Sequence, residues 1–311
     1  MSYKVLVTCP PMLLQIDRFS KKFSDLDIEV TTPEIKQTLS VDELIQIVPE
    51  HDGWIIGDDP ATKEVFSAGK KGSLRAAVKW GIGTDNVDFK ACDSLSIPIK
   101  NTPGMFGGEV ADVAIAYIIG LARNLFEIDR NIRRGGWPKP AGISINNKTL
   151  GIIGLGDIGS NVASRANALG MKIVGWDPYS KETPDYIRLE RNWPDGIEDC
   201  DFIVFTCALT NETKHMLNKK VLEKIENGVR IINVSRGSLI ETSALMEGLK
   251  NKIIISAALD VYENEPIPGD NPILKYSNCI LGSHNASNTI EAVDRASNKA
   301  IELLYEMLEG K

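Results

Sequence analysis

Short apolar runs alternate with polar or amphipathic stretches along almost the whole chain. Many of these runs are nearly continuous Val, Ile, Leu and Phe, which is typical of strands covered on both faces in a parallel sheet. The pattern predicts strands at 3–8, 28–31, 54–56, 74–79 and 97–100, and a second series at 149–153, 172–176, 201–206, 229–234, 253–259 and 279–281. Strands and helices that alternate in this way predict an α/β fold with doubly wound parallel sheets.

Apolar residues at helical spacing predict three helices in particular, at 41–48, 108–133 and 290–308. The second of these ends before 135–140, where Gly and Pro cannot continue a helix. The two long helices flank the second strand series and could return the chain to the first series.

The length of 311 residues predicts about two domains. Asp and Glu number 42 against 35 Lys and Arg, and a net charge of −7 argues against general nucleic-acid binding, which needs a basic face. No apolar run approaches the roughly 20 residues that cross a bilayer, and the run at 5–7 is too short for a signal peptide. These features predict a cytoplasmic protein with no membrane partner.

Five cysteines are present, an odd number without a C-x-x-C pair, so a disulfide framework is not expected and a reducing compartment fits better. The three histidines, His51, His215 and His284, do not have the spacing of metal ligands, so no metal site is expected. His51 and His215 are interpreted as surface residues, and the cysteines as small apolar or surface residues.

Residues 154–159 read G-x-G-x-x-G between a predicted strand at 150–153 and a predicted helix at 161–169. Gly154 allows the tight turn, Gly156 lets backbone amides approach a pyrophosphate, and Gly159 lets helix and strand pack closely. In that setting the motif predicts a dinucleotide site.

Asp177 follows the next predicted strand, where the adenosine ribose would lie. Its carboxylate can accept hydrogen bonds from the ribose hydroxyls and would repel a 2′-phosphate. Because residues 178–180 contribute no arginine, NAD(H) is favoured over NADP(H).

The chain resembles the D-isomer-specific 2-hydroxyacid dehydrogenases over essentially its full length. The resemblance rests on residues 79–88, 101–104, 110–112, 154–159, 209–213, 233–237, 258–261 and 265–266, and on His284. It implies a discontinuous substrate-binding domain of residues 1–100 plus 288–311 and an NAD-binding Rossmann domain of residues 101–287. The active site would lie in a cleft between them, and the family usually forms homodimers through the cofactor domain.

By the same resemblance, Arg236, Glu265 and His284 are the catalytic residues. Each follows a predicted strand, and the carboxyl ends of such strands are where ligands bind in doubly wound sheets. The guanidinium suits a carboxylate, and the imidazole can give or take a proton. A carboxylate beside the imidazole would fix its tautomer and raise its pKa.

The resemblance implies further contacts with cofactor and substrate. The cofactor contacts are Val110, Gly154, Gly156, Asp157, Ile158, Gly159, Asp177, Cys207, Ser235, Arg236 and Asp260. The substrate contacts are Lys79, Trp80, Gly81, Ile82, Arg236 and His284. In this scheme Gly81 and Ile82 use their backbone amides for the substrate carboxylate, whereas Val110 is explained equally well by core packing.

Three features depart from the family. After His284, many members have a branched residue, two glycines and then Ala-Thr, whereas residues 285–289 read Asn-Ala-Ser-Asn-Thr. The added side chains leave the substrate assignment open. Asp157 puts a carboxylate near the pyrophosphate and must point to solvent. The chain ends at Lys311 directly after the last predicted helix, so the regulatory domain of some phosphoglycerate enzymes is not expected.

The sequence therefore predicts an NAD-dependent oxidoreductase that interconverts a D-2-hydroxy acid and its 2-oxo acid. Phosphoglycerate or glycerate/hydroxypyruvate types are the first expectation. One alternative is the oxidation of formate or phosphite, which needs no acid for a carbonyl oxygen. Another is a non-catalytic scaffold that senses NAD(H).

Overall fold

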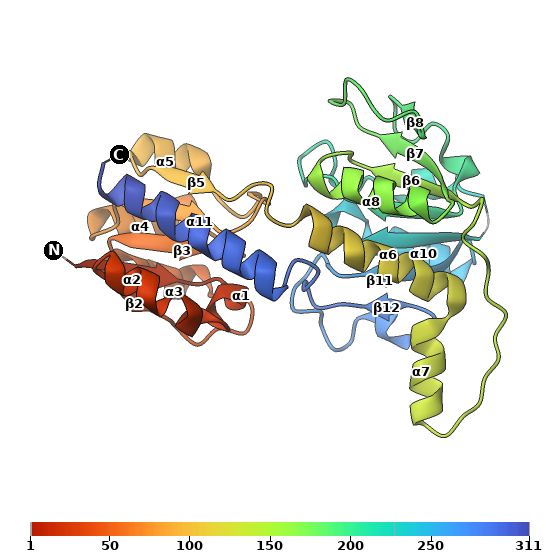
Figure 1. Ribbon diagram of the computed structural model, residues 1–311, viewed down its shortest axis with the longest axis horizontal. Helices are drawn as coiled ribbons and strands as arrows, with labels where there is room; N and C mark the ends of the chain where they lie inside the picture. The colour runs from red at the N-terminus through yellow and green to blue at the C-terminus, as the bar shows by residue number, and fades with distance from the viewer. Residues whose placement is uncertain (1, 227, 311) are drawn as a thin grey trace. The chain divides into compact units, whose positions relative to one another are not determined.

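The computed structural model describes residues 2–226 and 228–310, and the chain divides into two compact units. One unit, which we call the terminal unit, comprises Met1–Met105 and Asn288–Lys311. The other, the central unit, comprises Phe106–Ser287. Each unit has a parallel sheet with helices packed against it, so the predicted α/β class is confirmed (Figure 1).

The sheet of the terminal unit has five strands in the order β2-β1-β3-β4-β5. The strands are β1 (Tyr3–Val7), β2 (Ile28–Thr31), β3 (Gly53–Ile56), β4 (Ala76–Lys79) and β5 (Ile99–Asn101). The helices are α1 (Pro10–Leu13), α2 (Ser20–Asp25), α3 (Val41–Ile47), α4 (Lys63–Lys71), α5 (Phe89–Leu95) and α11 (Ile290–Leu308). Helix α11 packs on β3 and β4, so both ends of the chain share one core.

The sheet of the central unit has seven strands in the order β12-β11-β10-β9-β6-β7-β8. The strands are β6 (Thr149–Ile153), β7 (Lys172–Trp176), β8 (Ile187–Glu190), β9 (Phe202–Phe205), β10 (Val229–Asn233), β11 (Ile254–Leu259) and β12 (Ile280–Leu281). The helices are α6 (Gly107–Arg123), α7 (Leu125–Arg133), α8 (Asp157–Ala168), α9 (Lys219–Leu222) and α10 (Thr242–Lys250). The chain leaves β6 toward β7 and returns on its other side at β9, which makes the carboxyl ends of β6 and β9 the switch point where ligands bind in such sheets.

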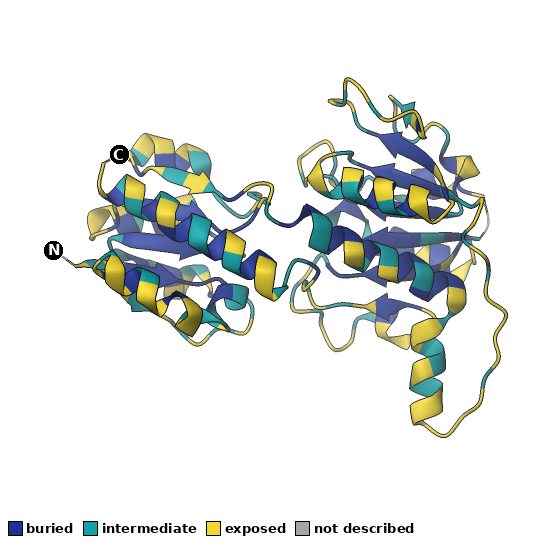
Figure 2. Cartoon of the chain, viewed as in Figure 1, coloured by how far each residue is buried: buried dark blue, intermediate teal, exposed yellow. Residues whose placement is uncertain are grey.

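The strands interior to both sheets are buried on both faces, whereas the covering helices keep an exposed stripe (Figure 2). All four residues of β3 and of β9 are buried. This explains why the predicted strands coincide with the observed ones to within two residues at almost every boundary: a doubly covered strand is an unbroken apolar run. The partly exposed edge strand β8 lacks such a run and was not predicted.

The predicted helix at 108–133 is two helices. Asn124 takes a left-handed conformation with φ of 55°, which ends α6 and starts α7. Asn tolerates this conformation better than most residues, and a hydrophobic pattern does not register it. Helix α6 packs against α8, whereas none of the nine residues of α7, all of which the structure describes, is buried.

His51 is buried, so its interpretation as a surface residue was wrong. Its side chain bonds the Ile47 carbonyl oxygen through Nδ1 at 2.9 Å and the Thr31 hydroxyl through Nε2 at 2.7 Å. Both ring nitrogens thus have partners, as a buried imidazole requires.

All five cysteines are free thiols, and four of them are buried. Over residues 2–226 and 228–310, no helix is long and apolar enough to cross a membrane. Over the same residues, no cluster of three His, Cys, Asp or Glu side chains could hold a metal ion.

Candidate functional site

The turn between β6 and α8 has the close contacts that its glycines permit. Gly154 has a φ of +90°, in the region that favours glycine. A Cβ atom on Gly159 would lie 1.9 Å from the Gly154 carbonyl oxygen, so no larger residue fits there. Thr206 secures the turn, because its hydroxyl donates to the carbonyl oxygens of Ile153 at 3.0 Å and Gly154 at 2.7 Å.

The N-terminus of α8 suits the pyrophosphate of a dinucleotide. Among the described residues, no side chain caps this twelve-residue helix at its N-cap, Gly156. A Cβ atom on Gly156 would have nothing within 4 Å, so space is open beside the first amides of the helix. Those N–H groups and the helix dipole attract an anion. The residues present therefore fit the cofactor.

Asp157 is exposed at the start of α8, as the cofactor prediction requires. Its carboxylate lies where a side chain on Gly107, the first residue of α6, would collide with it. A negative charge at that helix start is favourable.

Asp177 lies at the carboxyl end of β7 and contacts the glycine turn directly. Its Oδ2 accepts from the Leu155 amide at 2.8 Å, and its Oδ1 accepts from the Tyr179 amide at 2.8 Å. Arg191 lies close by and donates to the Ser180 carbonyl oxygen at 2.6 Å. The sequence analysis missed this arginine, because it is distant along the chain.

Cys207 and Ser235 come together at the other side of the turn. The Ser235 hydroxyl donates to the Cys207 carbonyl oxygen. The Cys207 backbone lies 2.7–2.8 Å from where a Cβ atom of Gly154 would be. Burial raises the pKa of the Cys207 thiol to about 12, so this thiol is protonated and unreactive near neutral pH.

Arg236 lies in a tight turn after β10 that Asn233 organises. The buried Asn233 amide donates to the Arg236 carbonyl oxygen at 2.9 Å, and its Oδ1 accepts from the Ser235 amide at 3.1 Å. The Arg236 guanidinium donates to the Ser235 carbonyl oxygen at 3.0 Å. Asn233 was not among the predicted site residues, although it belongs to the motif that carries Arg236.

Glu265 and His284 form a hydrogen-bonded pair. His284 Nδ1 lies 2.7 Å from Glu265 Oε2, and the side chains are 23% and 20% exposed, so solvent still reaches the pair. The other carboxylate oxygen, Oε1, accepts from the Tyr262 amide at 2.8 Å. With Nδ1 donating to the carboxylate, Nε2 becomes the ring nitrogen that can exchange a proton with a ligand.

Asp260 fixes the backbone around His284 through two hydrogen bonds. The His284 amide donates to the Asp260 carbonyl oxygen at 2.6 Å, and the Ala286 amide donates to Asp260 Oδ2 at 2.8 Å. Between these bonds His284 has a φ of 55°, a conformation that needs such support. Asp260 is 2% exposed and Val110, another residue expected to contact the cofactor, is 5% exposed.

Strand order explains why the predicted catalytic residues converge on one edge. Strands β10, β11 and β12 are adjacent and parallel, and Arg236, Glu265 and His284 follow them in that order. The structure brings Glu265 and His284 into direct contact.

In the terminal unit, Lys79 and Trp80 are committed to internal bonds. The Lys79 ammonium donates to the carbonyl oxygens of Gly57 at 2.7 Å and Trp80 at 3.1 Å, and pairs with Asp58 at 3.2 Å. The Trp80 indole donates to the Ser297 hydroxyl at 3.1 Å. We interpret both side chains as shaping the loop that follows them.

The backbone amides of Gly81 and Ile82 in that loop, which are predicted to bind the substrate carboxylate, have different surroundings. The Gly81 amide donates to the Thr102 hydroxyl at 2.8 Å, so it must leave this partner before it can bind a ligand. Ile82 has a side chain that is 46% exposed. Carboxylate binding by this loop stays a prediction.

The fold, the glycine turn and the histidine–carboxylate pair are those of a dinucleotide-dependent oxidoreductase of the α/β class. The crystal structure of TT0316 protein from Thermus thermophilus has the same fold, with a TM-score of 0.86, 29% identity and coverage of 99% of this chain and 97% of that one. The NAD-binding domain of D-isomer-specific 2-hydroxyacid dehydrogenases matches residues 115–286. The chain belongs to this family.

Similar curated proteins fall into three activities. The chain is 36% identical to a glyoxylate reductase of Korarchaeum cryptofilum, covering 81% of this chain and 78% of the relative. It is 33% identical to a hydroxypyruvate reductase of Thermotoga maritima, covering 91% and 92%. It is 35% identical to a D-3-phosphoglycerate dehydrogenase of Archaeoglobus fulgidus, covering 99% of this chain but 58% of that relative.

Proposed function

We propose that this protein uses NADH to reduce a small 2-oxo acid, of the glyoxylate or hydroxypyruvate type, to the D-2-hydroxy acid. The observation that carries the proposal is the hydrogen bond between His284 and Glu265 at 2.7 Å. A carbonyl oxygen that becomes a hydroxyl needs a proton. A carboxylate beside an imidazole favours the protonated form of the imidazole, which can supply that proton.

In this proposal His284 donates a proton from Nε2 to the carbonyl oxygen of the substrate. Glu265 holds the ring through Nδ1 and stabilises its positive charge. Arg236 binds the substrate carboxylate through its planar guanidinium. NADH, when bound, supplies the hydride. In the reverse direction the neutral imidazole takes the proton from the hydroxyl.

The proposed cofactor contacts are the amides of Asp157 and Ile158 for the pyrophosphate and Asp177 for the adenosine ribose. Asp177 favours NAD(H) over NADP(H) by charge. Arg191 beside Ser180 offers the opposite charge nearby. We expect Asp177→Ala to raise kcat/KM with NADPH relative to NADH, and an unchanged ratio would remove Asp177 from cofactor selection.

A panel of NADH-oxidation assays tests the proposed activity. The substrates are glyoxylate, hydroxypyruvate, pyruvate and phosphohydroxypyruvate, with formate and phosphite tested against NAD⁺. Turnover of glyoxylate or hydroxypyruvate is expected. Preference for phosphohydroxypyruvate would move the assignment to the phosphoglycerate type, and bound NADH without any turnover would favour the sensing scaffold.

The proposal includes a homodimer that forms through the central unit. Helix α7 exposes Leu125, Phe126 and Ile132, which are 40–48% exposed, and Trp137 beyond it is 79% exposed. Several exposed apolar side chains on and just after one helix support an interaction surface there. Sedimentation of Ile132→Asp should show monomers where the unaltered chain shows dimers.

We also propose a cytoplasmic location. The support is chemical, because five free thiols suit a reducing compartment. Fractionation of cells that express the protein tests this directly.

A further inference from the structure

A second histidine–carboxylate pair joins His215 to Glu263, which lies on the same loop as Glu265. His215 Nε2 is 2.7 Å from Glu263 Oε1, and the two side chains are 37% and 26% exposed. His215 was expected at the surface with no specific partner, but it is half-buried and pairs with this carboxylate. Glu263 precedes Glu265 by two positions, so whatever holds Glu263 also constrains Glu265.

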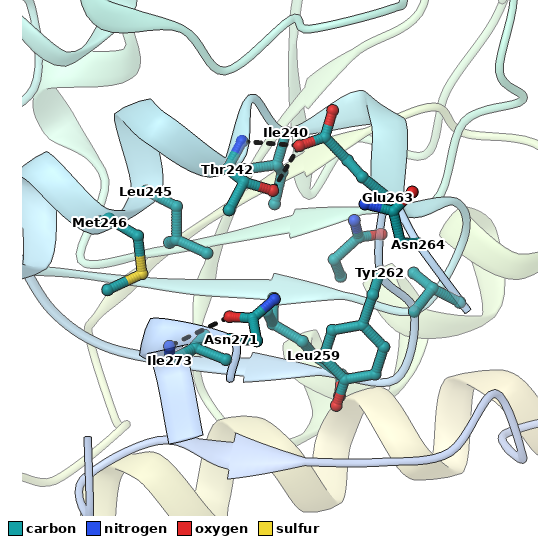
Figure 3. Close-up of a pocket in the computed structure, with 13 residues that line it drawn as sticks. Ile240, Thr242, Leu245, Met246, Leu259, Tyr262, Glu263, Asn264, Asn271 and Ile273 are labelled. Atoms are coloured by element: carbon teal, nitrogen blue, oxygen red, sulfur yellow. Dashed lines mark hydrogen bonds between the residues drawn. The ribbon is translucent and has the colours of Figure 1, made fainter. Parts of the chain in front are cut away.

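Glu263 also ties this loop to a helix. Its Oε2 accepts from the Thr242 amide at 3.0 Å and from the Thr242 hydroxyl (Figure 3). Thr242 is the first residue of α10, and in the described part of the chain the N-cap Glu241 makes no side-chain capping bond. First-turn amides need an acceptor, and here a carboxylate from another loop provides it.

One face of this loop borders a cavity, whereas its backbone at Tyr262 and Glu263 lies close against Gly237. Tyr262, Glu263 and Asn264 line a cavity of about 150 Å³, together with apolar residues of α10 and β11. Figure 3 shows these side chains around the hollow, with the hydrogen bonds from Thr242 to Glu263 at one edge of it. On the face toward the cavity, polar links rather than side-chain packing hold the loop in one position.

Glu263 is charged in this setting. Burial would raise the pKa of its carboxyl, but hydrogen bonds from Thr242 and His215 outweigh that effect, and the pKa lies below its ordinary value. The groups that face it are Thr242 from α10 and His215 from the segment before α9.

We infer that Glu263 is a positioning residue, which with His215 and Thr242 fixes the loop so that Glu265 meets His284. The inference rests on the proposed function, because it assigns Glu263 a role in the protonation of His284. Glu263 does not touch the substrate in this scheme. It acts through Glu265, whose carboxylate must stay within hydrogen-bond reach of Nδ1.

The test compares Glu263→Ala and His215→Gln with the control Glu247→Gln, which breaks an exposed ion pair between α10 and Lys219. Glu263→Ala should lower kcat about tenfold or more, with KM and the Kd for NADH changed less than about twofold. The basic limb of the pH profile for oxo-acid reduction should move to lower pH. His215→Gln should show a smaller shift in the same direction, and the control should match the unaltered enzyme.

A structural role alone would lower Tm and the active fraction without moving the pH profile, and that result would overturn the inference. A second readout, which does not need turnover, is the pH titration of the His284 ring followed by NMR. The chain has three histidines, and the signal that is lost in His284→Asn identifies His284. An enzyme inactive on every oxo acid would refute the proposed function, whereas an unchanged His284 titration in Glu263→Ala would refute the positioning role. If Glu263→Ala fails to fold, His215→Gln carries both measurements, because its side chain is the more exposed of the pair.

Discussion

The two units share a parallel α/β architecture, yet the turns at the carboxyl edges of their sheets differ in whether they can bind an anionic ligand. In the central unit the chain leaves β6 through a glycine turn into the twelve-residue α8. In the terminal unit it leaves β1 through Thr8 and Cys9 into the four-residue α1, which starts with Pro10. The turn after β6 presents backbone amides beside open space. The turn after β1 has no glycine, and the helix that follows it is too short to offer an anion site.

The terminal unit fills its edge with its own polar side chains. The buried Asp59 accepts from the Leu39 amide at 2.9 Å and from the Thr8 hydroxyl, and burial raises its pKa above the ordinary value. Lys79 supplies the positive charge nearby and bonds the Gly57 carbonyl oxygen. The polar groups of this edge bond one another, whereas the central edge adds a glycine turn and an uncapped helix start beside open space. The turn that follows a strand, more than the sheet itself, therefore decides whether that edge is structural or can bind a ligand.

The largest expected effect is on the chemistry of the central edge. His284→Asn keeps a residue that tolerates the positive φ but removes the acid, so kcat should fall by about 10²–10⁴. Tm and the Kd for NADH should change little. Steady-state assays and NADH fluorescence titration measure both, and turnover at the original rate would remove His284 from the mechanism.

At the terminal edge, substitution should cost stability. Lys79→Met removes the buried ammonium that donates to the Trp80 carbonyl oxygen and leaves the Gly57 carbonyl oxygen with Asn86 as its donor, so the free energy of unfolding should fall by about 2–3 kcal/mol. Urea denaturation measures the loss, with the exposed Lys71→Met as the control. A variant as stable as the original chain would contradict the structural interpretation of this edge.

A methyl group on Gly156, which has open space beside it, should weaken cofactor binding without changing the stability of the fold. Gly156→Ala has no protein atom to strike, so Tm should stay within about 1 °C, while the Kd for NADH rises about tenfold, or about 1.4 kcal/mol. Gly159→Ala would press on the Gly154 carbonyl oxygen and should destabilise the chain as well. Unchanged NADH affinity in Gly156→Ala would place the pyrophosphate elsewhere.

The smallest effect concerns the charge beside the pyrophosphate site. Asp157→Asn removes an exposed negative charge at the start of α8, so NADH should bind about two- to fivefold more tightly, corresponding to about 0.4–1 kcal/mol. Because the site is exposed, the gain should shrink in high salt. Titrations at two ionic strengths check both points, and weaker binding would mean that the Asp157 carboxylate organises the turn.

Sequence pattern predicted the strands well because doubly covered strands are apolar throughout. It missed β8, whose partly exposed edge has no such run, and the break at Asn124, which depends on one backbone angle. His51 was misjudged because hydrogen bonds, here to Ile47 and Thr31, let an imidazole be buried, and those partners come from other elements.

For the site, motif order identified Glu265 and His284, and the structure puts them in contact. Glu263, Asn233 and Arg191 escaped prediction because their roles depend on partners that only folding supplies: Glu263 needs Thr242, and Arg191 needs the turn after Asp177. The hydrogen bonds of Lys79 likewise end on backbone carbonyls, which carry no signal in a sequence.

The amino-acid order alone determined the α/β class, the glycine turn and the family, because these depend on local pattern and on residue types at fixed spacing. Tertiary structure decided which polar groups are already satisfied and which remain available to a ligand. A hydrogen bond between distant segments forms only when the sheet sets their separation. Lys79 ends one apolar strand and His284 follows another, and only their neighbours in space distinguish a structural cation from a candidate acid.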